Sequence, residues 1–197
     1  MSDVTLAILA GGEGARMGVA KGDLRIGRTP ILAYLLRRMA GEEQTMLVTA
    51  PGREHPPACE RFDREVVDPV AGQGPLRGVL TALEHASTPI VVVATVDMPG
   101  MGREQLRWYV DRLSDRPDIL GVMARRGEQI EPFPAAFRIE AADVVRAELQ
   151  AGRGSVRQLC ERAGFVTFES PPGWDERTWT NLNRPQDLQA FLARSNA

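Results

Sequence analysis

Residues 4–22 read VTLAILAGGEGARMGVAKG, an apolar run that passes directly into a glycine-rich loop with two cations, Arg16 and Lys21. A short continuous apolar run such as VTLAIL (4–9) is typical of a strand buried on both faces of a parallel sheet. Ligands of such sheets bind in the crevice at the carboxyl ends of the strands. We therefore expect the loop after this first strand to be a binding site.

The rest of the chain alternates short apolar runs with amphipathic helical patterns. The expected strands are TMLVTA (45–50), REVVD (64–68), PIVVVATV (89–96), DILGVMA (118–124) and PAAFRI (134–139). Apolar residues at helical spacing predict helices around residues 31–39, 76–83, 106–113, 141–149, 156–163 and 188–192. SPPGWDERT (170–178) is expected to be an irregular loop. This alternation predicts an α/β fold, a doubly wound and mostly parallel sheet flanked by helices.

The bulk properties narrow the class of protein. A length of 197 residues, with 43% hydrophobic and 25% charged residues, suits a single domain over residues 1–197. The formal net charge of -2 gives no global basic field, so nucleic acid is not an expected partner. No run approaches the ~20 apolar residues of a membrane helix, and Asp3 stands where a signal peptide has a basic region. We expect a cytoplasmic protein with no membrane partner.

The cysteines and histidines show no ligand spacing in the sequence. Cys59 and Cys160 lie far apart, and His55 and His85 are isolated. Reduced, buried thiols are the expected state of both cysteines, and no catalytic histidine is expected.

The glycines of the first loop leave backbone N–H groups uncovered. Gly11, Gly12 and Gly14 would let phosphate oxygens approach the main chain and collect several hydrogen bonds. Arg16 would neutralise the phosphate charge as a planar fork, and Lys21 would do so as a point charge. A P-loop is excluded because no Ser or Thr follows the lysine, and the dinucleotide fingerprint is excluded because its third glycine is missing. The alternative is a glycine-rich turn with solvated cations.

The segment LAGGEGARMGVAKG (9–22) is followed by four further motifs. They are GRTPIL (27–32), VVDPVAGQGPLRGVLTAL (66–83), TVDMPGM (95–101) and WTNLNRPQDL (179–188). In this order, and over nearly the whole chain, they resemble the motifs of the molybdenum cofactor guanylyltransferase family, within the nucleotidyltransferase superfamily. Three positions depart from the family pattern, with Ala20 in place of an acid, Arg77 in place of alanine and Val96 in place of cysteine.

The resemblance implies a Rossmann-like nucleotidyltransferase fold and a Mg²⁺-dependent enzyme that transfers GMP from GTP to molybdopterin. Pyrophosphate leaves, and the guanine dinucleotide form of the cofactor results. The catalytic residues that it implies are Lys21, Arg16 and Asp97, with Asp97 as the metal ligand. The nucleotide-binding residues that it implies are Leu9, Ala10, Gly11, Gly12, Lys21, Asp68, Gly74, Pro75 and Leu76. It assigns the pterin to Asn181 and Asn183, and it implies transient contact with other molybdenum cofactor biosynthesis proteins or acceptor apoenzymes.

The residues themselves support these roles but leave structural alternatives open. Asp97 follows the most apolar run, and Mg²⁺ needs only one or two carboxylates beside substrate phosphates; the alternative is a cap on the next helix. Asp68 either lies beside the ribose or base or is a turn residue. The segment 72–78 enters a helix N-terminus, which favours anions. Asn181 and Asn183 would point the same way from an extended segment and suit a pterin ring, although Asn183 could instead cap the last helix.

Two other functions remain open from the sequence. A cytidylyl- or sugar-phosphate nucleotidyltransferase would keep the chemistry and change the substrates. The pair Gly11-Gly12, where those relatives tend to have Ala-Gly, favours guanine. A non-catalytic nucleotide-binding module is the second alternative. Ala20 supports it, whereas the presence of both Lys21 and Asp97 argues against it.

Overall fold

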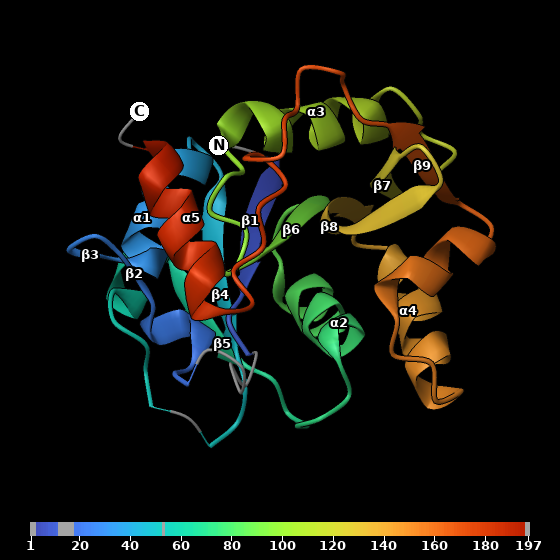
Figure 1. The fold of residues 1–197 in the computed structure, drawn as a ribbon. Coiled ribbons are helices and arrows are strands. Elements are labelled where there is room, and N and C mark those ends of the chain that lie inside the picture. The colour runs from blue at the N-terminus through green and yellow to red at the C-terminus, as the bar shows by residue number, and fades with distance from the viewer. Residues whose placement is uncertain (1–2, 12–17, 53, 196–197) are drawn as a thin grey trace.

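The computed structural model describes residues 3–11, 18–52 and 54–195, and these form an α/β architecture (Figure 1). Over these residues, seven strands build one sheet in the order β5-β4-β1-β6-β8-β7-β9. Their bounds are β1 Val4–Leu9, β4 Gln44–Thr49, β5 Arg64–Val67, β6 Ile90–Thr95, β7 Gly121–Arg126, β8 Gln129–Arg138 and β9 Phe165–Glu169. A separate antiparallel ribbon pairs β2 Arg25–Ile26 with β3 Thr29–Pro30.

The strands of the sheet run mostly in one direction. β1 pairs in parallel with both β4 and β6, and β5 pairs in parallel with β4. β8 alone among these seven strands is antiparallel to its neighbours, β6 and β7. β7 and β9 pair in parallel and run in the common direction. The central strands are buried on both faces, as parallel strands covered by helices must be. The predicted doubly wound, mostly parallel sheet is therefore confirmed.

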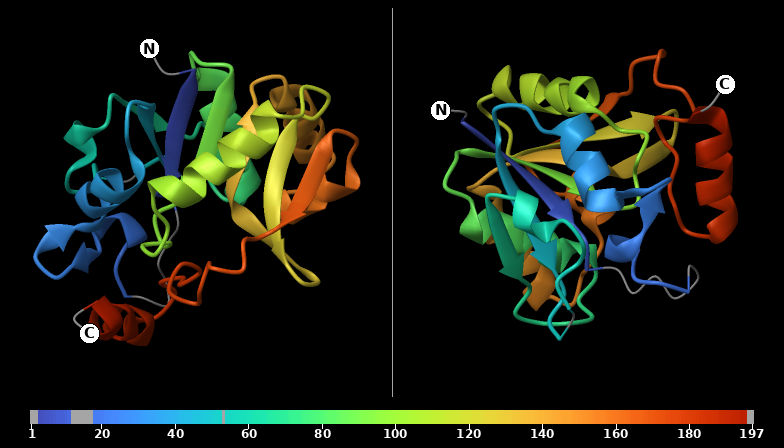
Figure 2. Two further views of the ribbon diagram at one scale, coloured as in Figure 1. Left: turned by 90° about the horizontal axis from the view of Figure 1, so that it is seen from above. Right: turned by 90° about the vertical axis from the view of Figure 1, so that its left-hand side faces the viewer.

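Helices cover both faces of the sheet (Figures 1 and 2). The α-helices are α1 Ile31–Met39, α2 Pro75–His85, α3 Arg103–Ser114, α4 Ala141–Gln150 and α5 Pro185–Ser195. α2 packs on β1, β4 and β6 and lies beside α4, whereas α3 packs on the other face against β6, β7 and β8. α5 stands next to α1, where the Tyr34 and Phe191 rings meet edge to face at 6.4 Å between centroids. Over the described residues, no helix is long and apolar enough to cross a membrane.

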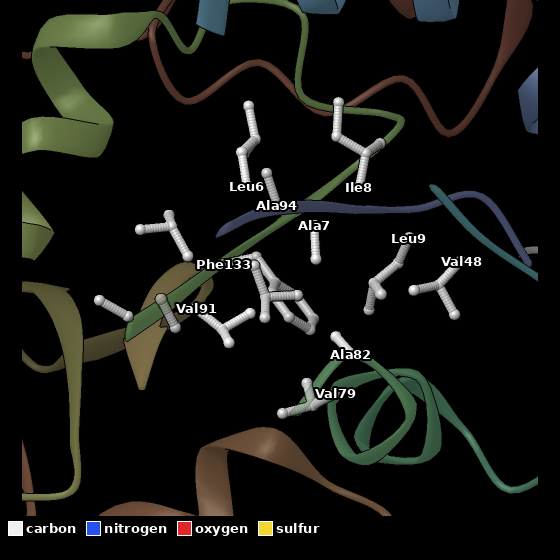
Figure 3. Close-up of a cluster of buried hydrophobic side chains, with 14 of the residues drawn as sticks. Leu6, Ala7, Ile8, Leu9, Val48, Val79, Ala82, Val91, Ala94 and Phe133 are labelled. Atoms are coloured by element: carbon white, nitrogen blue, oxygen red, sulfur yellow. The ribbon is translucent and has the colours of Figure 1, made fainter. Parts of the chain in front are cut away.

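The core centres on β1, whose side chains alternate between the two faces of the sheet (Figure 3). Leu6 and Ile8 point to one side, and Ala7 and Leu9 point to the other, toward α2. A Cβ added at Gly78 of α2 would lie 3.2 Å from the methyl carbons of Leu9. The glycine therefore lets the helix approach the strand closely, at the end of β1 where the first loop begins.

The structure differs from the sequence prediction at three places in the second half of the chain. Residues 156–163 were expected to be helical, and the structure has a short 3₁₀ helix at Val156–Glu161. This helix ends at Glu161, because its C-cap residue Arg162 already has extended backbone dihedral angles. β9 was not predicted, because only Phe165 among its five residues is fully buried and the apolar alternation is weak. β8 begins earlier than expected, since a hairpin turn at Gly127, with a φ of +59°, sends the chain straight back along β7.

Further 3₁₀ helices lie at Lys21–Asp23 and Cys59–Arg61. Cys59 and Cys160 are free thiols, as expected, although both are half-buried.

Candidate active site

Lys21 and Asp97 meet at the carboxyl end of the sheet, although 76 residues separate them in sequence. Asp97 follows β6, and Lys21 begins the 3₁₀ helix that comes after the glycine loop. The backbone N–H of Val96 donates to the Leu9 carbonyl at 3.1 Å, which keeps the ends of β1 and β6 together. The Lys21 ammonium donates to Asp97 Oδ2, and the two side chains are only 17% and 14% exposed. The fold thus joins two of the predicted catalytic residues in one ion pair.

A segment near the C-terminus completes this centre. Leu182 N donates to the Asp97 carbonyl at 2.8 Å, and Asn183 Oδ1 accepts from the Lys21 ammonium at 2.8 Å. With its amide nitrogen directed at the carboxylate, Asn181 donates to Asp97 Oδ2 at 2.9 Å. Both asparagines therefore face the same centre. Asn183 also lies just before α5, where Asp187 Oδ2 accepts from the backbone N–H groups of Asn183 and Arg184.

The loop that carries Asp97 is held on two sides. Arg38 of α1 donates to the carbonyl oxygens of Gly100 at 3.2 Å and of Met101 at 3.3 Å. A Cβ added at Gly100 would lie only 1.8 Å from the Arg177 carbonyl oxygen, so the C-terminal segment presses directly on this loop. The alternative role of Asp97 as a helix cap is wrong, because Gly102 occupies the N-cap of α3.

A cavity of about 690 Å³ opens beside the ion pair. The predicted residues that line it are Leu9, Gly11, Lys21, Asp68, Gly74, Pro75 and Asp97. Ala10 lines a neighbouring cavity instead, and Leu76 is fully buried in the core, so the side chain of Leu76 does not reach a ligand. Gly12 and Arg16 lie outside the described residues.

The backbone at two corners of this cavity is open to a ligand. A Cβ added at Gly11 would lie 3.4 Å from the Ala50 Cβ, an ordinary contact, so packing does not demand glycine there. At the start of α2, Gly74 has a φ of +73°, and no described side chain caps this helix end. Its first N–H groups are therefore available to an anion, and the helix dipole favours negative charge there.

The turn before α2 is braced by a second loop. A Cβ added at Gly154 would lie 2.8 Å from the Gln73 carbonyl oxygen, so the two backbones touch. Glu148 of α4 accepts two hydrogen bonds from Arg153 and two from Arg162, and these bonds lower the pKa of Glu148 to about 2. A second cavity, of about 660 Å³, lies between this loop and the turn.

Asp68 is the second carboxylate that lines the cavity of about 690 Å³. Its Oδ1 is buried and has no hydrogen-bond partner among the described residues. Burial raises the pKa of Asp68, against the opposing effects of a Thr81 hydrogen bond and the charges of Arg77 and His85. Arg77, which departs from the family pattern, donates to Thr81 Oγ1 at 3.1 Å and to Glu84 Oε2 at 3.1 Å. Its guanidinium is thus anchored along α2.

Part of the cavity wall was not predicted from the sequence. Ala50, Pro51 and Gly52, directly after β4, line it together with the turn at residues 70–73. The Pro-Gly turn behind a buried strand was the signal that could have identified them. Although the cysteines and histidines show no ligand spacing in the sequence, the fold places possible metal-ligand atoms of His55, Cys59 and Glu65 within 4.8 Å of one another.

Comparisons with known proteins show the family and the fold. The pattern of the family described as MobA-like NTP transferase domain matches residues 6–165. A Burkholderia vietnamiensis protein named molybdenum cofactor guanylyltransferase is 32% identical over 97% of this chain and 96% of its own. Molybdopterin-guanine dinucleotide biosynthesis protein A from Archaeoglobus fulgidus has a similar structure, with a TM-score of 0.82, 22% identity and 98% of each chain covered. 2-C-methyl-D-erythritol 4-phosphate cytidylyltransferase from Thermus thermophilus shares the fold at a TM-score of 0.68 and 18% identity, with 97% of this chain and 98% of that chain covered.

Proposed function

Because the chain belongs to the MobA-like NTP transferase domain family, we propose that it transfers GMP from GTP to molybdopterin and releases pyrophosphate. The observation that carries this proposal is the Lys21–Asp97 pair, which lies at the edge of a cavity of about 690 Å³ and contacts two asparagine amides. A cation, a carboxylate and open backbone N–H groups are the groups that a nucleoside triphosphate requires.

GTP would lie in the cavity between the first loop and the turn before α2. The backbone of residues 9–11 and of residues 74–76 would enclose the guanine. Asp68 Oδ1, which has no partner among the described residues, would accept a hydrogen bond from the ribose hydroxyls or from the base. The α2 N-terminus and Lys21 would attract the phosphates.

The acceptor would approach from the side of the C-terminal segment. Asn181 and Asn183 would bind the pterin with amides that both donate and accept. A phosphate oxygen of molybdopterin then forms a bond to the α-phosphorus of GTP, and the bond from that phosphorus to the departing pyrophosphate breaks. The acceptor is already an anion, so no protein nucleophile is needed. The protein contributes alignment and charge neutralisation.

Mg²⁺ fits the donor set at this centre. Asp97 offers a partly buried carboxylate at the cavity, and Mg²⁺ is bound by one or two carboxylates together with phosphate oxygens. Asp97 is the residue that would hold the ion. When bound, the metal neutralises the charge on the triphosphate.

The choice of base is tested by calorimetry on the full chain, with GTP, CTP, UTP and ATP in Mg²⁺ buffer. We expect GTP to bind at least about tenfold more tightly than the others, a difference of about 1.4 kcal/mol. Equal or tighter binding of CTP would overturn the guanylyl proposal and leave the fold untouched.

The acceptor side is tested by Asn181→Ala and Asn183→Ala. Each variant should weaken the use of molybdopterin by about 1–3 kcal/mol, the cost of a lost buried hydrogen bond, and should leave GTP affinity nearly unchanged. Thr180→Ala is the matched control, because Thr180 directly precedes Asn181 and its hydroxyl donates to the Glu176 carbonyl at 3.0 Å. Loss of GTP affinity in the asparagine variants would show that the segment does not belong to the acceptor.

A further inference from the structure

Three side chains with different metal-ligating atoms meet near the start of β5, and none of them lines the cavity proposed to hold GTP. His55, Cys59 and Glu65 each bring one nitrogen, sulfur or oxygen atom to within 4.8 Å of the other two. Two of them come from the segment 54–63 before β5, and Glu65 lies on the strand itself. The cluster therefore combines a loop with a rigid element.

Local contacts already orient these groups. His55 Nδ1 lies 2.8 Å from Glu65 Oε2, and the other carboxylate oxygen accepts from Thr49 Oγ1 of β4 at 3.3 Å. Cys59 N donates to the Pro56 carbonyl at 3.1 Å, and Phe62 N donates to the Cys59 carbonyl at 3.1 Å. The thiol therefore sits on a hydrogen-bonded turn, and the carboxylate is held by a neighbouring strand, as a metal ligand commonly is.

The dimensions of the cluster suit a zinc ion. Zinc binds nitrogen, sulfur and oxygen at about 2.0–2.3 Å, so ligand atoms around one ion lie roughly 3–4 Å apart. Small movements of the side chains would bring the three atoms to that spacing. The same donor set disfavours Mg²⁺, which prefers oxygen ligands throughout.

The surroundings of the cluster provide access and an attractive charge. The His55 side chain is 75% exposed, whereas that of Glu65 is only 19% exposed. His55 also lines a cavity of about 460 Å³, next to the exposed Glu54. Glu60 and Glu65 lie beside Cys59, and these two carboxylates favour a cation next to the sulfur.

We propose that His55, Cys59 and Glu65 bind one Zn²⁺ ion through three protein ligands, with the fourth coordination position open to solvent. The ion fastens the segment 54–63 to β5. Because Ala50, Pro51 and Gly52 come just before this segment and line the larger cavity, the ion also steadies one wall of that cavity.

Metal titration of the purified full chain tests the site without any assay of the transferase reaction. Co²⁺ serves as a spectroscopic probe, because a cobalt–thiolate bond gives a charge-transfer band that oxygen and nitrogen ligands do not. We expect one Co²⁺ per chain with this band, displaced by one equivalent of Zn²⁺ and unaffected by excess Mg²⁺. Cys59→Ser should abolish the band and weaken Zn²⁺ binding by more than about tenfold, and Glu65→Gln should weaken binding while keeping the band.

Cys160→Ser is the matched control, because it removes the other thiol and leaves the cluster intact; it should bind Co²⁺ like the original chain. Zn²⁺ should also slow amide hydrogen exchange at Cys59, Arg61 and Phe62 in the original chain and not in Cys59→Ser. Thermal unfolding of each variant without metal checks that it is folded. Equal Zn²⁺ affinity in Cys59→Ser and the original chain, or loss of the band in Cys160→Ser, would overturn the proposal.

Discussion

Lys21 and Asp97 neutralise each other while the cavity holds no substrate. Each side chain is mostly buried, and a buried charge without a partner costs free energy. A triphosphate offers Lys21 a different partner and leaves the Asp97 carboxylate for a metal ion. We propose that the pair exchanges partners when a nucleotide binds.

Substitution of Lys21 and substitution of Asp97 should therefore affect GTP affinity and turnover differently. Lys21→Ala removes the positive charge that would face the phosphates. GTP affinity should therefore fall by about 1.5–3 kcal/mol, and turnover should fall as well. Asp97→Asn keeps the shape and removes the carboxylate charge. Its single-turnover rate should fall on the order of 10²-fold while GTP affinity changes much less.

A metal titration separates the two variants further. Raising Mg²⁺ or substituting Mn²⁺ should partly restore Asp97→Asn and have no effect on Lys21→Ala. Near-normal turnover in Asp97→Asn would show that the carboxylate serves only to hold Lys21, and that any metal is bound elsewhere.

At the scale of elements, the site depends on how the segment before α5 crosses the loop after β6. The close approach of the Arg177 carbonyl to Gly100 leaves no room for a side chain. The hydrogen bond from Leu182 N to the Asp97 carbonyl fixes the crossing a few residues further on. The geometry at Asn181 and Asn183 is thus set by backbone contacts made outside the cavity.

Gly100→Ala tests this crossing. The added Cβ would displace the C-terminal segment, so we expect the free energy of unfolding to drop by about 1–3 kcal/mol and the KM for molybdopterin to rise. GTP affinity should change little. Gly173→Ala is the control, in the C-terminal segment that crosses this loop, because a Cβ there meets nothing within 4 Å and its backbone needs no positive φ. Identical behaviour of the two alanine variants would contradict the expected role of the crossing.

At the scale of the whole molecule, the sequence was informative wherever burial repeats with a regular period. The strands β1, β4, β5 and β6 and the five α-helices were expected close to their observed bounds, because apolar periodicity records which faces are covered. β9 was not predicted, because it is a half-exposed strand. Val156–Glu161 was predicted as an α-helix and is a 3₁₀ helix, because a spacing of three between buried residues is compatible with both.

The predicted site was recovered where a motif follows a strand. Lys21, Asp68 and Asp97 all come to the cavity because the carboxyl ends of β1, β5 and β6 share one edge of the sheet. The cluster of His55, Cys59 and Glu65 could not be seen in the same way. Its spacing matches no ligand motif and depends on the path of a loop, which hydrophobic periodicity does not encode.

The stability of the whole fold should depend on Asp68. In the unfolded chain this carboxyl ionises at its ordinary pKa, whereas burial raises the pKa in the folded protein. Folding therefore disfavours the ionised form of Asp68. The free energy of unfolding should fall as the pH rises from the pKa of the unfolded chain through the pKa of the folded protein. Asp68→Asn should be more stable than the original chain at neutral pH and should bind GTP less tightly.

Urea unfolding of the ligand-free protein at several pH values checks this expectation. The advantage of Asp68→Asn should vanish in acid, where the original carboxyl is protonated in both states, and should grow toward neutral pH. Asp3→Asn, at an exposed aspartate, is the control and should show no comparable trend. A variant that is less stable at neutral pH would show that the ionised carboxylate supports the fold.

The contact between Lys21 and Asn183 spans 162 residues of sequence, and its last partner lies close to the C-terminus. The ribosome makes every strand of the sheet before it makes the asparagine that closes the centre. A nascent chain that stops after β9 would already contain both carboxylates and the glycine turns, and it would lack the groups proposed to receive the acceptor. Translation therefore makes every residue that lines the proposed nucleotide cavity before it makes the asparagines proposed to bind the acceptor.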